Sequence, residues 1–70
     1  MVTGLQLRTF REAVAAWKAW DQIHIDGPEW FEALREATER TVECQEAFGI
    51  RMQPEACDRL DNAVWRWCRA

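Results

Sequence analysis

Six glutamates recur at helical spacing along the middle of the sequence. They are separated by three, four, three, four and three residues. At 3.6 residues per turn, this spacing places six carboxylates in one line about 25 Å long, which we call the acidic ridge. A convex line of carboxylates has no pocket that could give an acid and a base different pKa values, as catalysis needs. The ridge therefore indicates binding of arginine and lysine side chains on a partner. The acidic ridge consists of Glu29, Glu32, Glu36, Glu39, Glu43 and Glu46.

A second interpretation of the acidic ridge is a solvated helix face. Glutamate is a good helix former, and the ridge lies opposite Leu34 on a helical projection. Against this, like charges three and four residues apart repel, and a purely structural surface intersperses lysine. Arg35 and Arg40 lie to the two sides of the ridge, so it is only partly neutralised by its own helix. Both interpretations stay open.

Trp65 is the second candidate for partner binding. It lies off the apolar stripe of its segment, on the side of Asp58 and Asp61. Exposed tryptophan is typical of interfaces, where aromatic side chains carry much of the binding energy. The alternative is that the ring covers the edge of a neighbouring helix.

Catalysis and metal binding have little support in the sequence. His24 is the only histidine and has no nucleophile at a recognisable spacing. The three cysteines, Cys44, Cys57 and Cys68, form no CxxC pair. The spacing of a zinc site is therefore missing, and the thiols are expected to be small buried hydrophobes. We expect no enzymatic activity, no catalytic residues, no metal and no cofactor.

The positions of proline and glycine divide the chain into three helical segments. Thr3 with Gln6 and Thr9 with Glu12 both fit a capping box at the start of the first helix, and we favour the longer helix that begins after Thr3. Pro28 and Pro54 suit first helical positions, and Gly49 suits the left-handed position after a helix end. Short turns between amphipathic helices predict an all-α, compact three-helix bundle with antiparallel neighbours. The single domain is expected to span 1–70, with helices at about 4–24, 28–48 and 54–69.

The apolar periodicity predicts the core. Leu7 and His24 fall on the apolar stripe of the first helix, and every segment contributes side chains at spacings of three and four residues. The residues expected at the centre are Trp17, Leu34, Leu60, Phe10, Val64 and Trp67.

The first helix carries a second apolar face. A helix that is apolar nearly all round is buried on more than one side, and small domains often complete their core with a partner subunit. We therefore expect a homodimer whose interface contains Leu5, Ala16, Ala19, Trp20 and Ile23.

Composition excludes several classes of protein. The chain has 70 residues, of which 49% are hydrophobic, and is therefore not disordered by composition. Its net charge of −3 argues against direct, charge-driven binding to nucleic acid or to an anionic membrane. No run approaches the ~20 apolar residues of a membrane span, and the N-terminus lacks the apolar stretch of a secretory peptide, so we expect a cytoplasmic protein.

These features predict a small, non-enzymatic acidic interaction protein. Its ridge would occupy a basic surface of a larger protein, one that binds nucleic acid. Phage-encoded inhibitors of host defence, including anti-CRISPR proteins and other DNA mimics, work on this physical principle, and the analogy is one of size and charge only. The alternative is a small homodimeric scaffold or regulatory subunit that contacts partners through its apolar faces and Trp65.

Overall fold

The computed structural model describes residues 1–23, 25 and 27–70, and these residues form three helices without a strand. The expected all-α three-helix bundle is confirmed. The helices are α1 (Gly4–Asp21), α2 (Glu29–Phe48) and α3 (Pro54–Cys68).

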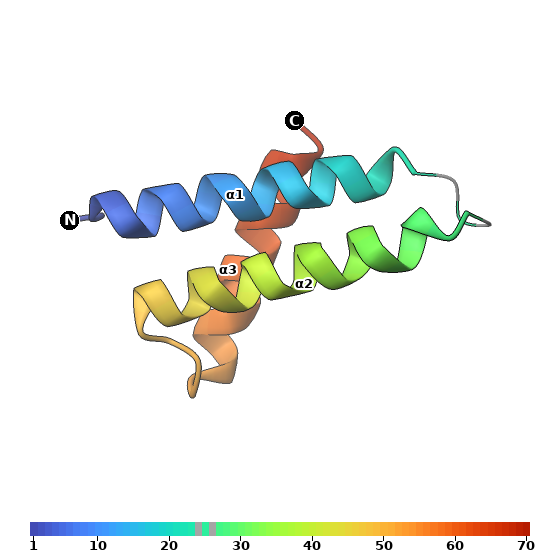
Figure 1. The fold of residues 1–70 in the computed structure, drawn as a ribbon. Helices are drawn as coiled ribbons and strands as arrows, with labels where there is room; N and C mark the ends of the chain where they lie inside the picture. The colour runs from blue at the N-terminus through green and yellow to red at the C-terminus, as the bar shows by residue number, and fades with distance from the viewer. Residues whose placement is uncertain (24, 26) are drawn as a thin grey trace.

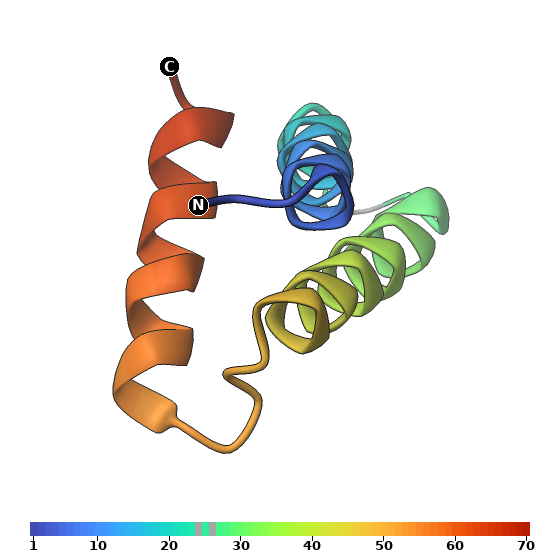
Figure 2. The ribbon, with the colours of Figure 1, turned by 90° about the vertical axis from the view of Figure 1, so that its left-hand side faces the viewer.

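The three helices are arranged as an antiparallel pair with a third helix laid across it. Helices α1 and α2 run side by side in opposite directions, as expected for neighbours joined by a short turn (Figure 1). Helix α3 instead crosses the pair steeply and lies against one side of α1 (Figure 2). A helix that crosses steeply covers only part of its neighbour, so the ends of α1 are less covered by α3 than its middle.

Helix boundaries follow the capping residues. Thr3 and Gln6 form the expected capping box, with the Gln6 amide donating to Thr3 Oγ1 at 3.1 Å and the Thr3 amide donating to Gln6 Oε1 at 2.9 Å. Gly49 has a φ of 69°, and the Ile50 amide donates to the Gln45 carbonyl at 3.1 Å, which closes α2 in a Schellman motif. The sequence correctly placed both caps.

Two boundaries differ from expectation. Helix α1 ends at Asp21 rather than near residue 24, with Gln22 as its C-cap. Helix α2 starts at Glu29, and Pro28 occupies the preceding cap position. The role expected for His24 on the apolar stripe concerns a residue outside the described part of the chain.

Small side chains form the contact between α1 and α2. The α1 residues Thr9 and Ala13 are buried, as are three small residues of α2. The Trp17 indole N–H donates to Thr41 Oγ1 at 2.8 Å across this contact. Helices can approach closely where the facing side chains are small. We call this contact the small-residue seam, and its members are Thr9, Ala13, Ala37, Thr41 and Cys44.

Aromatic rings cover one end of the small-residue seam. Trp17 and Trp20 of α1 meet edge to face with ring centroids 5.2 Å apart. Trp20 also packs on Trp30 of α2 at 5.8 Å, and Trp65 of α3 packs on Trp17 at 6.2 Å. Such rings bury large areas and add contact energy through their geometry. The cluster therefore joins all three helices.

The expected core is partly wrong. Val64 is buried, but Trp67 is 62% exposed, and Leu7 on the predicted stripe is 44% exposed. The error arises because periodicity identifies an apolar face without showing how far a neighbour covers it. Here α3 crosses α1 steeply (Figure 2), and Leu7 and Trp67 at the outer edge of this face stay open to solvent. The remaining four predicted centre residues, Trp17, Leu34, Leu60 and Phe10, are half-buried.

Candidate protein-binding face

All six glutamates of the acidic ridge are exposed. They lie on α2 beside α1, away from its buried residues Ala37 and Cys44, which are fully covered. The helix holds this geometry because its buried stripe and its charged stripe both repeat at the helical period. The structure thus brings the six carboxylates together, as the spacing predicts.

Arginines partly neutralise the ridge. Arg35 Nη2 lies 2.9 Å from Glu32 Oε2, and Arg51 Nη1 lies 3.5 Å from Glu46 Oε1. These pairs are largely exposed, and ion pairs of this kind are worth about 0–1 kcal/mol.

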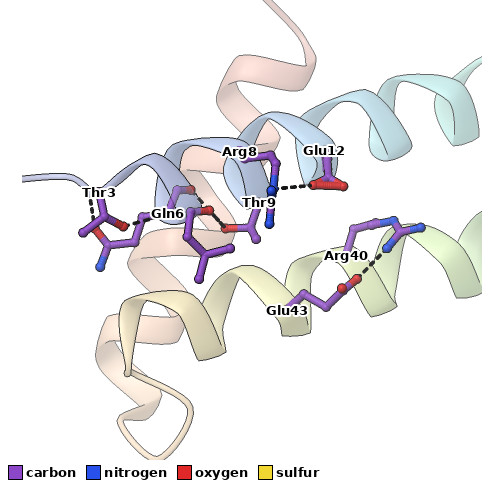
Figure 3. Close-up of polar contacts among 8 residues, drawn as sticks. Thr3, Gln6, Arg8, Thr9, Glu12, Arg40 and Glu43 are labelled. Atoms are coloured by element: carbon purple, nitrogen blue, oxygen red, sulfur yellow. Dashed lines mark hydrogen bonds and ion pairs between the residues drawn. The ribbon is translucent and has the colours of Figure 1, made fainter.

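Arg40 makes the strongest contact with the ridge. Its Nη1 lies 2.7 Å from Glu43 Oε1 and its Nη2 lies 3.5 Å from Glu36 Oε1. The hydrogen bond to Glu43 raises the pKa of the Arg40 guanidinium, with smaller contributions from the charges of Glu36 and Glu12. Figure 3 shows this arginine on α2 and the Arg8–Glu12 pair on the adjacent stretch of α1. Glu12 therefore adds a carboxylate from α1 beside the ridge.

A groove between α1 and α2 runs beside the ridge. Its apolar part comes from Ala19 of α1, from Ile23 just after α1, and from Ala33 of α2. Four ridge carboxylates line the same groove, and Arg35 and Arg40 lie at its edge. A long cationic side chain suits such a site, because its aliphatic stem can pack on the apolar part while its charged head meets carboxylates. The four carboxylates are Glu29, Glu32, Glu36 and Glu39.

A second hollow lies near the other end of the same helix pair. It is lined by Leu5 and Ala47 together with Glu12, Glu43 and Glu46. Apolar and acidic side chains are therefore combined at both ends of this face. We call the ridge with its two hollows the acidic face.

The residues expected to form a homodimer interface lie around this same helix pair. Trp20 packs on Trp30 of α2, and Ala16 is half-buried. Leu5, Ala19 and Ile23 line the two hollows beside α2. Of these five residues, Trp20 therefore packs on α2, whereas Leu5 and Ala19 remain exposed. Self-association stays a prediction.

Trp65 covers the aromatic cluster at the edge of α3. Its ring lies 6.2 Å from Trp17 and 6.3 Å from Trp20, and the Arg69 guanidinium lies 5.0 Å from its centroid. The side chain remains 37% exposed. The structure therefore gives Trp65 a packing role, and its contribution to partner binding stays a prediction.

The three cysteines are free thiols. Cys44 and Cys68 are buried, as expected, whereas Cys57 is half-buried with its Sγ 3.1 Å from the Ile50 carbonyl oxygen. Burial raises the pKa of the Cys44 and Cys68 thiols. Among the described residues, no cluster of histidine, cysteine and carboxylate side chains could hold a metal ion, and no helix is long and apolar enough to cross a membrane.

Sequence reasoning missed three contributors to the acidic face. Glu12 and Ala33 line its hollows, and Arg51 pairs with the end of the ridge from the turn after α2. Glu12 could have been found from its place one turn before Ala16 on the predicted interface side. Arg51 had no such signal, because its position depends on the path of the turn.

Comparisons with protein-family models, with curated proteins and with solved structures found no match to this chain. The site must therefore be interpreted from its own geometry and charge.

Proposed function

We propose that the protein is a non-enzymatic interaction protein that uses its acidic face to occupy a basic surface of a larger protein. The observation that carries the proposal is the coincidence of exposed carboxylates with apolar hollows along one helix pair. Carboxylates attract and orient a cationic surface, and the hollows accommodate the stems of its long side chains.

The proposed partner class is a protein whose basic surface binds nucleic acid. A row of carboxylates about 25 Å long offers such a surface repeated negative charge on a rigid rod, as a phosphate backbone does. Inhibitors that mimic DNA, including anti-CRISPR proteins encoded by phages, act by this principle. An inhibitor of this kind would work in the cytoplasm, where its targets bind DNA or RNA.

Capture experiments with a matched pair of charge reversals test this proposal. The first variant, Glu36→Lys with Glu39→Lys, places two cations in the acidic face. The control, Glu55→Lys with Asp58→Lys, makes the same change in net charge on exposed positions of α3. Each immobilised protein is incubated with a lysate of the producing cells or their host, and retained proteins are identified by mass spectrometry.

We expect wild-type protein and the control to retain a basic partner that the first variant loses. Retention should fall steeply as salt rises, because exposed ion pairs are screened. Circular dichroism should show the same helix content for all three proteins, since surface substitutions usually change stability by under about 0.5 kcal/mol. Retention of the same partners by both variants, with no dependence on salt, would contradict the proposal and favour a scaffold that binds through apolar surfaces.

A further inference from the structure

A second groove lies on the other side of α1, where α3 crosses it. Most of its lining residues are apolar, and it remains open: Trp67 is 62% exposed and Leu7 is 44% exposed. Exposed apolar side chains gathered in one place mark binding sites more often than scattered ones do. The main lining residues are Leu7, Phe10, Val14, Leu60, Ala63 and Trp67.

Positive charges border this groove. Arg11 and Lys18 line it from α1. On α3, Arg59 lies four residues before Ala63 and Arg66 lies three residues after it. Helical spacing therefore places both arginines on the flank next to the groove. We call the apolar surface with these four cations the basic groove.

The four cations of the basic groove differ from the other basic residues of the protein. Four arginines elsewhere pair with glutamates, and Arg69 lies over the Trp65 ring. Among the described residues, no carboxylate forms an ion pair with Arg11, Lys18, Arg59 or Arg66. Within the part of the chain that the structure describes, the cations without a carboxylate partner therefore gather around this open apolar groove.

We propose that the basic groove binds an acidic amphipathic helix of a partner protein. The apolar stripe of such a helix would cover Leu7 and Trp67, and its flanking carboxylates would meet the four cations. Arg11 and Lys18 are seven residues apart, about 10 Å along α1, a separation that carboxylates spaced by two helical turns can match. The partner must therefore supply both negative charges for the four cations and an apolar surface for the groove, and an acidic amphipathic helix supplies both.

Two other occupants fit less well. A second copy joined groove to groove would bring the cations of both copies together, and like charges across an interface are unfavourable. The acidic face of a second copy would match the cations, but its apolar side chains lie in two hollows beside the ridge and do not project as a stripe that could cover Leu7 and Trp67. Nucleic acid would meet the cations as well, but only a helix with an apolar stripe also fills a narrow apolar groove.

A pair of designed peptides tests the basic groove directly. The probe is a helical peptide of about 18 residues, or five turns, with leucines along one stripe and glutamates on both flanks. The matched peptide carries lysine in place of every glutamate. Both are titrated into the nitrogen-15-labelled full chain, and the indole N–H signal of Trp67 is assigned with Trp67→Phe.

We expect the glutamate peptide to shift the Trp67 signal and the lysine peptide to leave it in place. Arg11→Glu with Lys18→Glu should weaken binding of the glutamate peptide at least about tenfold at low salt. Arg35→Glu with Arg51→Glu makes the same change in net charge outside the groove. It should weaken binding of the glutamate peptide less than about twofold. Trp67→Ala removes apolar contact and should also weaken binding, and its largely exposed position means that the fold should be retained.

Several results would overturn this assignment. Equal weakening by the two double reversals would mean that net charge alone controls binding. An unshifted Trp67 signal at millimolar glutamate peptide would mean that the groove does not accept an acidic helix. Tighter binding of a DNA duplex or of anionic lipid vesicles, lost in Arg11→Glu with Lys18→Glu, would assign the groove to a polyanion. A concentration-dependent dimer mass that Trp67→Ala abolishes would assign it to a second copy.

Discussion

Helix α1 meets its two neighbours in different ways. Towards α2 it presents small side chains such as Thr9 and Ala13, and the two helices run side by side along the small-residue seam. Towards α3 it presents larger side chains such as Phe10 and Val14, and α3 crosses steeply. The comparison shows that close, extended packing leaves two hollows between the helices beside the ridge, whereas a steep crossing leaves an open apolar groove.

Charge follows the same division. The α1–α2 side carries the acidic face, in which exposed carboxylates outnumber the arginines that pair with them. The α1–α3 side carries the basic groove, whose cations have no carboxylate partner among the described residues. A chain with a net charge of only −3 therefore contains two surfaces of opposite sign.

The largest expected effect separates the seam from the groove. Ala37 is fully buried in the small-residue seam, so Ala37→Leu should lower the free energy of unfolding by about 1–3 kcal/mol through overpacking. Ala15 lines the open groove and is exposed, so Ala15→Leu should change the free energy of unfolding by less than about 0.5 kcal/mol. Urea unfolding followed by circular dichroism measures both. Equal costs for the two substitutions would mean that the seam is not closely packed.

An intermediate effect distinguishes two neighbouring tryptophans. Trp17 donates to Thr41 across the seam, whereas the buried Trp20 Nε1 has no hydrogen-bond partner within residues 1–23, 25 and 27–70. Trp17→Phe should therefore cost about 1 kcal/mol more than Trp20→Phe, since only the first removes a hydrogen bond between helices. Thermal and urea unfolding of the two variants provide the test. A larger loss for Trp20→Phe would show that ring packing outweighs the hydrogen bond.

The smallest expected effect concerns the thiols. Burial raises the pKa of Cys44 and Cys68, so the unfolded chain loses these thiol protons at a lower pH than the folded chain. The free energy of unfolding should be unaffected by these groups below the ordinary thiol pKa of about 8.5 and should fall above it, by under about 1 kcal/mol per thiol at pH 9.

Urea unfolding at pH 7 and pH 9 measures this dependence. Cys44→Ala with Cys68→Ala should reduce it, while Cys57→Ala serves as the control at a half-buried position. The same pH dependence in all three proteins would assign it to other groups. A thiol reagent at neutral pH should modify Cys57 before the two buried cysteines.

Local signals predicted the helices and the ridge well. Thr3, Gly49 and Pro54 each act within one or two turns of the chain, so capping preferences place them from sequence alone. The exposure of the acidic ridge follows from helical periodicity in the same way. These features need no knowledge of how the helices pack.

The packing of α1 could not be predicted from its sequence. The helix is apolar nearly all round, so periodicity does not show which face meets α2 and which meets α3. Trp67 was expected at the centre and is exposed, because its burial depends on the crossing of α3 and not on the local pattern. The apolar hollows beside the ridge also arise only when α1 and α2 are brought together.

Mapping both designed peptides on the wild-type protein tests the division into two faces most directly. Backbone and indole N–H signals are followed while the lysine peptide and the glutamate peptide are titrated separately. We expect the lysine peptide to shift signals of Ile23, Glu36 and Glu39, and the glutamate peptide to shift those of Leu7, Lys18 and Trp67, with little overlap. If both peptides shift one common set of signals, or shift all signals uniformly, the protein does not have two separate binding faces.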